Sequence, residues 1–349
     1  MNPVSHKLIH WYKANKRDLP WRHTKDAYHI WLSEIIMQQT QVVQGLAYYN
    51  KFVERYRQVS DLAKAPEDEV MRLWQGLGYY SRARNLHAAA KHIHAQFKGK
   101  FPDNYNDIRA LKGVGDYTAA AVASFAFDLP HAVVDGNVYR VLSRLFGIST
   151  PINSTQGKKE FQQLADELLD RKRPALHNSA MMEFGALHCR PQNPGCESCV
   201  LQSHCYAFQH KAVHKFPVKE KAAPAKERFL NYIVLKHKNQ VYIRKRTEKD
   251  IWQNLYEFML IETAKRSKEE KILTDPVFKS LKVEFTLQHV SKEYRHILSH
   301  QILHAVFYVV ELRKPLKNST FKAVNVSSLD EYGFPRLIGK FLGDYAKLS

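Results

Sequence analysis

Two carboxyl groups, Glu34 and Asp135, occupy positions where they could cooperate in chemistry. Glu34 falls within the stretch 27–42, which is predicted to be helical, and follows Ile30 and Trp31 by four and three positions on one apolar face. Burial on that face would raise the pKa of the acid and keep it protonated near neutral pH, as a general acid requires. The alternative is an acid at the edge of the apolar stripe that reaches water.

Asp135 follows the apolar run 132–134 and precedes Gly136. This position predicts that Asp135 N-caps a helix starting near Val138, which by itself is a structural role. The positive end of such a helix would also favour the ionised carboxylate. A protonated acid and a carboxylate form the pair that breaks glycosidic bonds through an oxocarbenium-like state. On the residues alone, the structural alternative stays open for both acids.

The cysteines indicate a metal site, because all four lie between positions 189 and 205 with the spacing Cys-x6-Cys-x2-Cys-x5-Cys. Four thiolates can hold zinc or an iron–sulfur cluster. Zinc sites usually consist of two Cys-x2-Cys pairs, and only one pair here has that spacing, so the pattern favours a 4Fe-4S cluster. Zinc and a purely structural role remain alternatives. The four residues are Cys189, Cys196, Cys199 and Cys205.

A glycine-rich turn, Gly113-Val114-Gly115, follows Leu111-Lys112 and leads into an alanine-rich run. Two glycines two positions apart permit a tight turn with positive φ and a close backbone approach. Asp116 or Thr118 is expected to cap the helix that follows. The N–H groups at the start of that helix could bind a phosphate oxygen regardless of base sequence. The alternative is an ordinary helix–turn–helix corner without a ligand.

The elements that must position these residues are mostly helices over residues 1–188, where apolar residues recur at three- and four-residue steps. The clearest examples are Ala27–Met37, Val70–Trp74, Arg82–Phe97, Thr118–Phe127 and Val138–Phe146. A polar stretch with two prolines, Lys215–Arg228, predicts an exposed linker.

The pattern changes after this stretch. β-rich runs occur where helical periodicity is absent, and they predict a small α+β domain. The predicted strands are Phe229–Leu235 and Val241–Arg246, joined by a hairpin at Lys236–Gln240, and His304–Leu312; the predicted helices are Ser267–Ile272 and Pro335–Tyr345.

The chain is basic throughout. It has 53 Lys and Arg against 34 Asp and Glu, a net charge of +19, with 28 basic and 19 acidic residues in 1–215 and 25 and 15 in 216–349. Such a balance favours a polyanion partner, most simply nucleic acid, although a soluble basic protein would show it too.

The size and composition exclude two broad classes of protein. The 349 residues, 44% of them apolar, predict two folded domains rather than a disordered chain. No apolar run is long enough to cross a membrane, and residues 1–11 lack the apolar core of a secretory signal, so we expect a cytoplasmic protein. If its polyanion partner is DNA, we expect it to associate with the nucleoid.

Five motifs occur together in one order. They are Trp-Leu-Ser-Glu-Ile-Ile-Met-Gln-Gln-Thr-Gln-Val (31–42), Gly-Leu-Gly-Tyr-Tyr-Ser-Arg-Ala (76–83), the glycine-rich turn, Val-Asp-Gly-Asn-Val (134–138) and the four cysteines. With them the chain strongly resembles the helix–hairpin–helix DNA glycosylases with an iron–sulfur cluster, and among these the MutY-type adenine DNA glycosylases. The match is dense over residues 10–210 and sparse afterward.

The resemblance implies a mainly α-helical catalytic region of two helical subdomains, which includes the helix–hairpin–helix and a 4Fe-4S loop. A smaller α+β Nudix-like domain is expected to follow. The implied domains are 1–214, with the cluster loop at 189–205, a linker at 215–228 and the Nudix-like domain at 229–349.

The resemblance also assigns catalytic roles. Glu34 matches the acid that protonates the adenine ring, and Asp135 matches the carboxylate that stabilises or transiently bonds to the sugar cation. Asn137 fits a polar partner that supports them. Tyr117 stands where the endonuclease III-type enzymes have a lysine that forms a Schiff base, so the match implies a monofunctional glycosylase with little or no lyase activity.

The target base must leave the duplex to react. Gln39 and Tyr79 match residues that wedge into the helix beside the opposite base, although core packing next to Tyr80 is an alternative for Tyr79. The motif 17–22 matches the pocket and entry segment, with conventional packing as its alternative. Its residues with assigned DNA contacts are Arg17, Trp21 and Arg22, and the backbone of Gly113, Val114 and Gly115 is expected to hold a phosphate.

The second domain is similar to the family's Nudix-like domain, but residues 262–290 lack the Gly-x5-Glu-x7-Arg-Glu box that binds metal in Nudix hydrolases. Recognition is therefore expected rather than hydrolysis. Family members sense 8-oxoguanine with a Phe-Ser-His loop, which matches Leu298-Ser299-His300 here with leucine in place of the aromatic residue. Ser179 is a second departure, because relatives often have a larger polar or acidic residue near the adenine pocket.

These resemblances imply an enzyme that excises adenine from duplexes containing A:8-oxoguanine or A:G pairs. The expected cofactor is a 4Fe-4S cluster, and we expect a monomer that binds double-stranded DNA and no membrane. One alternative is an endonuclease III-type glycosylase/lyase acting on oxidised pyrimidines. Another is a catalytically silent DNA-binding module held together by zinc.

Overall fold

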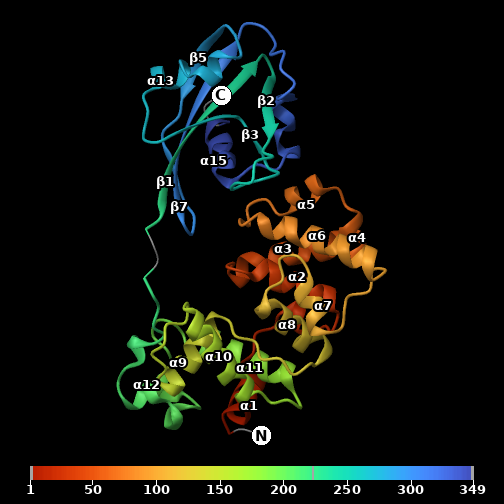
Figure 1. Ribbon diagram of the computed structural model, residues 1–349, viewed down its shortest axis with the longest axis vertical. Helices are drawn as coiled ribbons and strands as arrows, with labels where there is room; N and C mark the ends of the chain where they lie inside the picture. The colour runs from red at the N-terminus through yellow and green to blue at the C-terminus, as the bar shows by residue number, and fades with distance from the viewer. Residues whose placement is uncertain (1–2, 222–223, 347–349) are drawn as a thin grey trace. The chain divides into compact units, whose positions relative to one another are not determined.

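The computed structural model describes residues 3–221 and 224–346, and its chain divides into two compact units. The helical unit comprises Met1–Lys64 and Asn85–Lys221, and the sheet unit comprises Ala65–Arg84 and Ala222–Ser349. The segment Ala65–Arg84 therefore belongs to the same unit as the C-terminal sheet. Figure 1 shows that the strands begin with β1 and lie in the C-terminal part of the chain.

The helical unit is built from helices joined by short turns, and every helix predicted from periodicity is present. The helix predicted over 27–42 is shorter than expected, because it ends at Met37 and a four-residue break precedes the next helix. Its helices are α1 (Pro3–Asn15), α2 (Ala27–Met37), α3 (Val42–Arg55), α4 (Val59–Lys64), α7 (Tyr105–Ala110), α8 (Asp116–Phe127), α9 (Gly136–Phe146), α10 (Thr155–Leu168), α11 (Pro174–Leu187) and α12 (Tyr206–Gln209), with short 3-10 turns at Pro20–Arg22, Cys196–Ser198, Gln202–His204 and Val213–Lys215.

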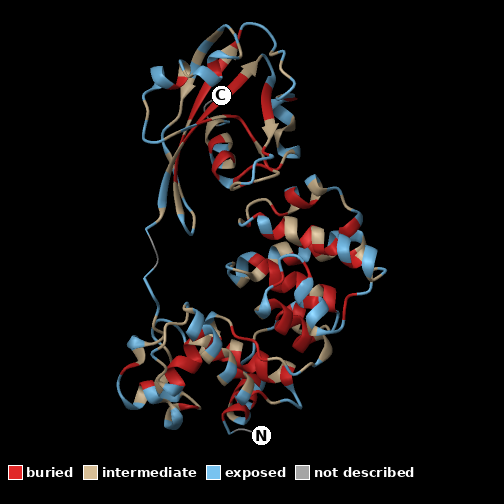
Figure 2. Ribbon diagram, viewed as in Figure 1, coloured by how far each residue is buried: buried red, intermediate tan, exposed pale blue. Residues whose placement is uncertain are grey.

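Helices α2 and α8 pack against each other and are buried on nearly all sides (Figure 2). Their sequences explain this, since both are apolar around most of the helix, as interior helices are. Asp26 caps α2 by accepting a hydrogen bond from the backbone N–H of His29 at 3.0 Å. This pairing matters because α2 carries Glu34 and α8 carries Tyr117.

A second core joins α1, α9, α10 and α11. Trp11 meets the ring of Phe184 edge-on at 5.0 Å, one of the favoured aromatic geometries. Helix α9 begins after Asp135 and ends at Gly147, whose φ of +69° suits glycine. The Asp135 side chain caps the start of α9, and the apolar face of the helix packs in this core. Both contacts fix the position of the helix start.

The sheet unit holds one mixed sheet, in which β1 runs parallel to β7 and antiparallel to β2 and β4. The predicted hairpin is confirmed, since Lys236 pairs with Val241 across the β1–β2 turn. The strands are β1 (Lys226–His237), β2 (Gln240–Lys245), β3 (Tyr256–Glu257), β4 (Met259–Thr263), β5 (Phe285–Val290), β6 (Tyr294–Ile297), β7 (Gln301–Leu312) and β8 (Lys322–Asn325). The helices are α5 (Glu67–Leu73), α13 (Glu269–Leu273), α14 (Pro276–Lys279) and α15 (Arg336–Tyr345), with a 3-10 turn at Val326–Glu331, and α6 (Ser81–Gln96) runs across the division at Arg84.

The connecting stretch expected over 215–228 is in part held on the helical unit. Arg144 Nε donates to the carbonyl of Phe216, and the N–H of Ile152 donates to the carbonyl of Val218. Two parts of these predictions lie outside the described residues. They are residues 222–223 of the predicted linker and residues 1–2 of the N-terminal segment that lacks a secretory signal.

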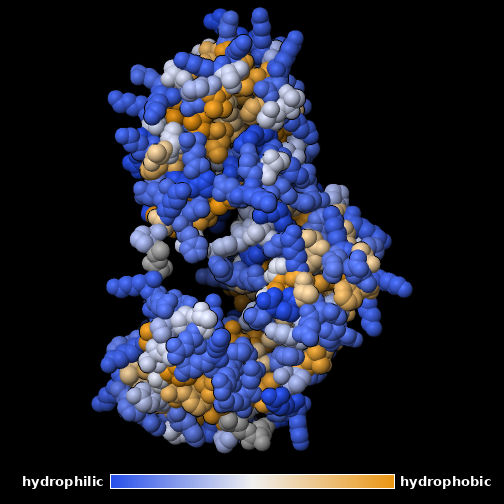
Figure 3. Space-filling view, viewed as in Figure 1, coloured by the Kyte–Doolittle hydropathy of each residue, from blue (hydrophilic) through white to orange (hydrophobic). Residues whose placement is uncertain are grey.

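No helix within residues 3–221 and 224–346 combines the length and the apolar character needed to cross a membrane. The face of the molecule in Figure 3 is covered mainly by hydrophilic residues.

Candidate active site

Glu34 and Tyr117 form a hydrogen-bonded pair between α2 and α8, in which Glu34 is buried and Tyr117 is half-buried. The Tyr117 hydroxyl donates to Glu34 Oε2 at 2.7 Å, and Glu34 is only 6% exposed. Burial raises the pKa of Glu34, the charge of Arg22 and the Tyr117 hydrogen bond oppose this shift, and the nearby charge of Asp135 reinforces it. Burial and the two acids raise the pKa of Tyr117, so it remains a phenol that can donate.

Asp135 caps α9, as its position predicts, and its carboxylate accepts three hydrogen bonds at 2.8 Å. The backbone N–H groups of Asn137 and Val138 donate to Oδ1, and the Asn137 side-chain amide donates to Oδ2. Burial raises the pKa of Asp135, and these three hydrogen bonds oppose the shift because they stabilise the anion.

Asn137 is itself held in place. Arg140 Nη2 donates to Asn137 Oδ1 at 2.8 Å and to the carbonyl of Gly185 at 2.7 Å. A Cβ atom on Gly185 would lie 2.7 Å from the Asn137 Cβ, so α9 and α11 approach each other closely at this point. Arg140 Nε also donates to the carbonyl of Cys189, which connects the carboxylate region to the cysteine loop.

The 3-10 turn Pro20–Arg22 brings Arg22 close to Glu34 and Tyr117. Its guanidinium lies 4.2 Å from the centre of the Phe125 ring, and its charge lowers the pKa values of Glu34 and Tyr117. Trp21 is buried and meets the Tyr49 ring edge-on at 5.1 Å. The predicted pocket segment thus reaches the Glu34–Tyr117 pair through Arg22, whereas Trp21 packs in the interior.

Glu183 on α11 is a further polar residue that the sequence analysis missed. Arg17 donates to it three times, from its backbone N–H at 2.9 Å and from its guanidinium at 2.7 and 2.8 Å. An acid within the apolar run 180–187 is the same signal that singled out Glu34, so the pattern contained this information. Ser179 is buried beside Tyr12 on the same side, where its hydrogen bond lowers the pKa of that phenol while burial raises it.

The glycine-rich turn connects α7 to α8. Gly113 has a φ of +81°, and a Cβ there would lie 2.6 Å from the Asn85 Cβ, so the turn requires glycine on both counts. The expected cap is wrong: Gly115 is the N-cap and no side chain caps α8. Asp116 accepts from Arg109 Nε at 2.5 Å instead.

A cavity of about 890 Å³ opens beside this turn. Gly115 and Tyr117 line one side, and Lys158 and Lys159 of α10 line another. Carboxylates of Asp116 and Asp166 also border it, so its charge is mixed.

Gln39 lies in the break between α2 and α3. It is exposed and has a φ of +53°, whereas its neighbour Gln38 donates to Thr118 Oγ1 of α8 at 3.2 Å. A left-handed conformation is uncommon for a residue other than glycine and occurs often at functional sites.

Within the sheet unit, Tyr79 lies next to the turn that joins β6 to β7. The Tyr79 hydroxyl and Ser299 Oγ are hydrogen-bonded at 2.8 Å, and Tyr79 is 45% exposed with a φ of +48°. The residue that packs in the core is the neighbouring Tyr80, which is buried, and not Tyr79. The turn itself is tight, because the N–H of Leu298 donates to the carbonyl of Gln301 at 2.8 Å.

The four cysteines line one small cavity of about 30 Å³, together with Arg144 and His188. Arg144 Nη1 donates to Cys189 Sγ at 3.4 Å and to the carbonyl of Arg190 at 2.8 Å. Among the residues that the structure describes, no three His, Cys, Asp or Glu side chains converge on a point suited to a single metal ion. The four thiols nevertheless share one small cavity with the Arg144 guanidinium, which contacts Cys189 directly.

Two protein-family models match the chain. Residues 32–170 match the family model of the HhH-GPD superfamily base excision DNA repair proteins, and residues 231–344 match the NUDIX domain. The chain is 32% identical over 344 residues to an adenine DNA glycosylase of Buchnera aphidicola, which covers 97% of each chain. It is 43% identical over 211 residues to the mouse adenine DNA glycosylase, which covers 58% of this chain and 41% of the mouse protein. A thermostable thymine-DNA glycosylase superposes with a TM-score of 0.56 and 32% identity, which covers 59% of this chain and 95% of that one.

Proposed function

Because the chain belongs to the adenine DNA glycosylase family, we propose that it is a monofunctional glycosylase that excises adenine paired with 8-oxoguanine or guanine. The proposal rests mainly on the hydrogen-bonded pair of Glu34 and Tyr117 and on the nearby Asp135 carboxylate, which caps α9. Such a pair supplies an acid for the leaving base and a negative charge for the sugar cation.

Glu34 is the proposed general acid. Adenine leaves a sugar poorly as an anion, so a proton delivered to its ring lowers the barrier to cleavage of the N-glycosidic bond. Burial favours the protonated carboxyl, which can give its proton to the base and then be stabilised as the anion by Arg22 and Tyr117.

Asp135 is the proposed stabiliser of the positive charge on the sugar. Its three N–H donors hold the carboxylate in a fixed orientation, and Asn137 and Arg140 extend this support. When the bond breaks, the carboxylate neutralises the oxocarbenium-like cation or bonds to it transiently, until water attacks the sugar. Tyr117 is a phenol and forms no Schiff base, so strand cleavage by a lyase step is not expected.

The proposed substrate is double-stranded DNA with the adenine flipped out of the helix. The uncapped start of α8 offers N–H groups to a phosphate, and Lys158 and Lys159 lie beside it. Gln39 and Tyr79 are exposed side chains proposed to enter the duplex, and the loop Leu298-Ser299-His300 is proposed to read the opposite base.

The four cysteines are proposed to bind a 4Fe-4S cluster. The donor set fits, because four thiols line one cavity and only one pair has the spacing of a zinc knuckle. Arg144 would offset the negative charge of the thiolates. The cluster would hold the loop after α11 in place, and it takes no part in the steps above. Iron and sulfide content of the purified protein would separate this from zinc.

Single-turnover base release tests the proposal. Duplexes would carry A:8-oxoguanine, A:G, A:T or an oxidised pyrimidine, and each would be analysed with and without hot alkali. Adenine release that yields strand breaks only after alkali is the expected result. Breaks without alkali at the oxidised pyrimidine, with adenine retained, would establish the lyase alternative. Iron-loaded protein that releases no base would establish a silent binding module.

A further inference from the structure

The first turn of α5 contacts the segment that joins β2 to β3 within the sheet unit. Lys245 Nζ donates to Asp68 Oδ1 at 2.5 Å, and the Tyr256 hydroxyl donates to Asp68 Oδ2 at 3.3 Å. The side-chain amide of Asn254 donates to Glu67. We call these contacts of Glu67 and Asp68 with the segment 245–256 the clasp.

The segment 245–256 has an unusual and well-fixed backbone. Trp252 and Asn254 have φ values of +63° and +67°, a conformation that residues other than glycine adopt only where their surroundings hold it. The N–H of Asn254 donates to the carbonyl of Arg246 at 2.8 Å, and the Trp252 side chain is buried. The clasp therefore contacts a loop whose backbone conformation is fixed.

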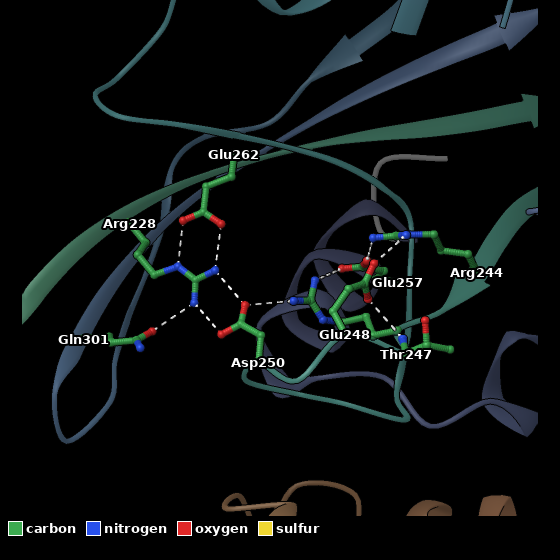
Figure 4. Close-up of polar contacts among 9 residues, drawn as sticks. Arg228, Arg244, Thr247, Glu248, Asp250, Glu257, Glu262 and Gln301 are labelled. Carbon is green, nitrogen blue, oxygen red and sulfur yellow. Dashed lines mark hydrogen bonds and ion pairs between the residues drawn. The ribbon is translucent and has the colours of Figure 1, made fainter. Parts of the chain in front are cut away.

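Arg228 links the same loop to Gln301, the first residue of β7 (Figure 4). Asp250 accepts from Arg228 at 2.7 and 2.9 Å and from Arg246 at 3.1 Å. Arg228 also donates to the side chain of Gln301 at 3.2 Å. Gln301 follows the turn directly, so Arg228 joins the loop to the base of the hairpin that presents Ser299.

Tyr79 belongs to the same segment, Ala65–Arg84, as Glu67 and Asp68 of the clasp. The segment Ala65–Arg84 is held at α5 by the clasp and at its end by Arg84, whose Nη1 donates to the carbonyl of Gln253 at 2.7 Å. Tyr79 lies between these two attachments and reaches Ser299 Oγ at 2.8 Å. Both partners of this hydrogen bond are exposed, so the contact alone would be weak in water.

We propose that the clasp is a positioning device for opposite-base selectivity, with Glu67 and Asp68 holding the Tyr79 segment in register with the Ser299 turn. The inference rests on the proposed function, in which both residues meet the DNA. Burial lowers the pKa of Lys245, whereas the hydrogen bond and charge of Asp68, with the charges of Tyr256 and Glu67, raise it, and the net shift is upward. One partly exposed ion pair is weak, so the register depends on the set of contacts.

Charge reversal with rescue tests the clasp. Asp68→Lys places two like charges together and is expected to slow adenine release opposite 8-oxoguanine about fivefold, with release opposite guanine changed less than about twofold. Lys245→Glu alone should act similarly, and the double variant should recover at least half of the lost selectivity. Glu331→Lys, an exposed site elsewhere in the sheet unit with the same change in charge, controls for stronger DNA attraction.

Hydrogen exchange of the amides in 294–303 supplies a readout that does not need activity. Faster exchange in Asp68→Lys and its reversal in the double variant are expected, with an unchanged thermal midpoint. Wild-type selectivity in Asp68→Lys, no recovery in the double variant, or an equal loss in Glu331→Lys would overturn the clasp. If the wild type releases no adenine, the proposed function fails, and unchanged hydrogen exchange in Asp68→Lys would separately refute the clasp.

Discussion

Glu34 is a buried carboxyl group and Asp135 is a half-buried one, and their hydrogen-bond partners differ. Glu34 receives one hydrogen bond, from a phenol, whereas Asp135 receives three from N–H groups at the start of α9. Each N–H donor stabilises an anion, so hydrogen bonds oppose the rise in the pKa of Asp135 with three donors and the rise in the pKa of Glu34 with one. This difference fits the proposed mechanism, in which one group is an acid while the other is a carboxylate.

The pH dependence of excision follows from this arrangement. In the proposed mechanism adenine release needs protonated Glu34, so the single-turnover rate should fall as the pH rises through the pKa of Glu34. The Tyr117 hydrogen bond lowers that pKa, so Tyr117→Phe should move the alkaline limb of the profile to higher pH while it reduces the maximal rate. An unchanged limb, or one moved to lower pH, would contradict the assignment.

The free energy of unfolding should also depend on the protonation of Glu34. The pKa of Glu34 is raised in the folded protein, so its favourable contribution is complete below the unfolded pKa and is lost as the pH rises through the folded value. Glu34→Gln should therefore increase the free energy of unfolding by about 1–2 kcal/mol at pH 8 and change it little at pH 4. Denaturant titration at the two pH values checks this, and a loss of stability at pH 8 would refute it.

Single residues could be predicted where an acid interrupts an apolar pattern or caps a helix. Glu34 and Asp135 carry such signals, and so does Glu183, although its partner Arg17 is 166 positions away. The partner of Tyr117 could not be derived from the residues, because an aromatic residue in the first turn of a helix shows no sign of what its hydroxyl meets.

At the scale of elements, the start of α9 depends on the close approach of α11. Gly185→Ala would place a Cβ 2.7 Å from Asn137 Cβ and 2.9 Å from its carbonyl oxygen. We expect a loss of about 1–3 kcal/mol in the free energy of unfolding, and slower adenine release because Asp135 moves with the helix start. Both are measurable by denaturation and single-turnover kinetics.

Gly339→Ala is the matched control, because that glycine also lies inside a helix but has no heavy atom within 4 Å of the added Cβ. It should stabilise the protein slightly, by about 0.5–1 kcal/mol, and leave excision unchanged. Equal effects of the two substitutions would show that the contact of α9 with α11 does not position Asp135.

Helices and strands could be predicted from periodicity because their apolar faces match the cores they meet. The break after Met37 and the uncapped start of α8 could not. The first depends on the left-handed backbone of Gln39, and the second on Arg109, which draws the Asp116 side chain away from the helix end.

At the scale of the whole molecule, the charge of +19 implies that DNA affinity depends on salt. A protein that neutralises about six phosphates loses on the order of a thousandfold in affinity between 50 and 200 mM salt. We expect a loss of this order for undamaged duplex, measured by fluorescence anisotropy. A loss of less than about threefold would mean that the basic residues do not contact the backbone.

The placement of Ala65–Arg84 with the sheet was beyond sequence reasoning. The contacts that hold it, such as Lys245 with Asp68, join residues 177 positions apart, and neither partner belongs to a motif. Local patterns predict the elements on each side, whereas the pairing of distant surfaces depends on shape and charge that only the folded chain displays.

The most direct test of the account is single-turnover adenine release from an A:8-oxoguanine duplex by the wild type and Glu34→Gln at equal iron content. Glutamine keeps the size and can accept the Tyr117 hydrogen bond, but it cannot donate an acidic proton to the base. A loss of at least about a hundredfold, with duplex affinity unchanged, is the predicted result. A variant that releases adenine at the wild-type rate would contradict the role of Glu34 and the mechanism built on it.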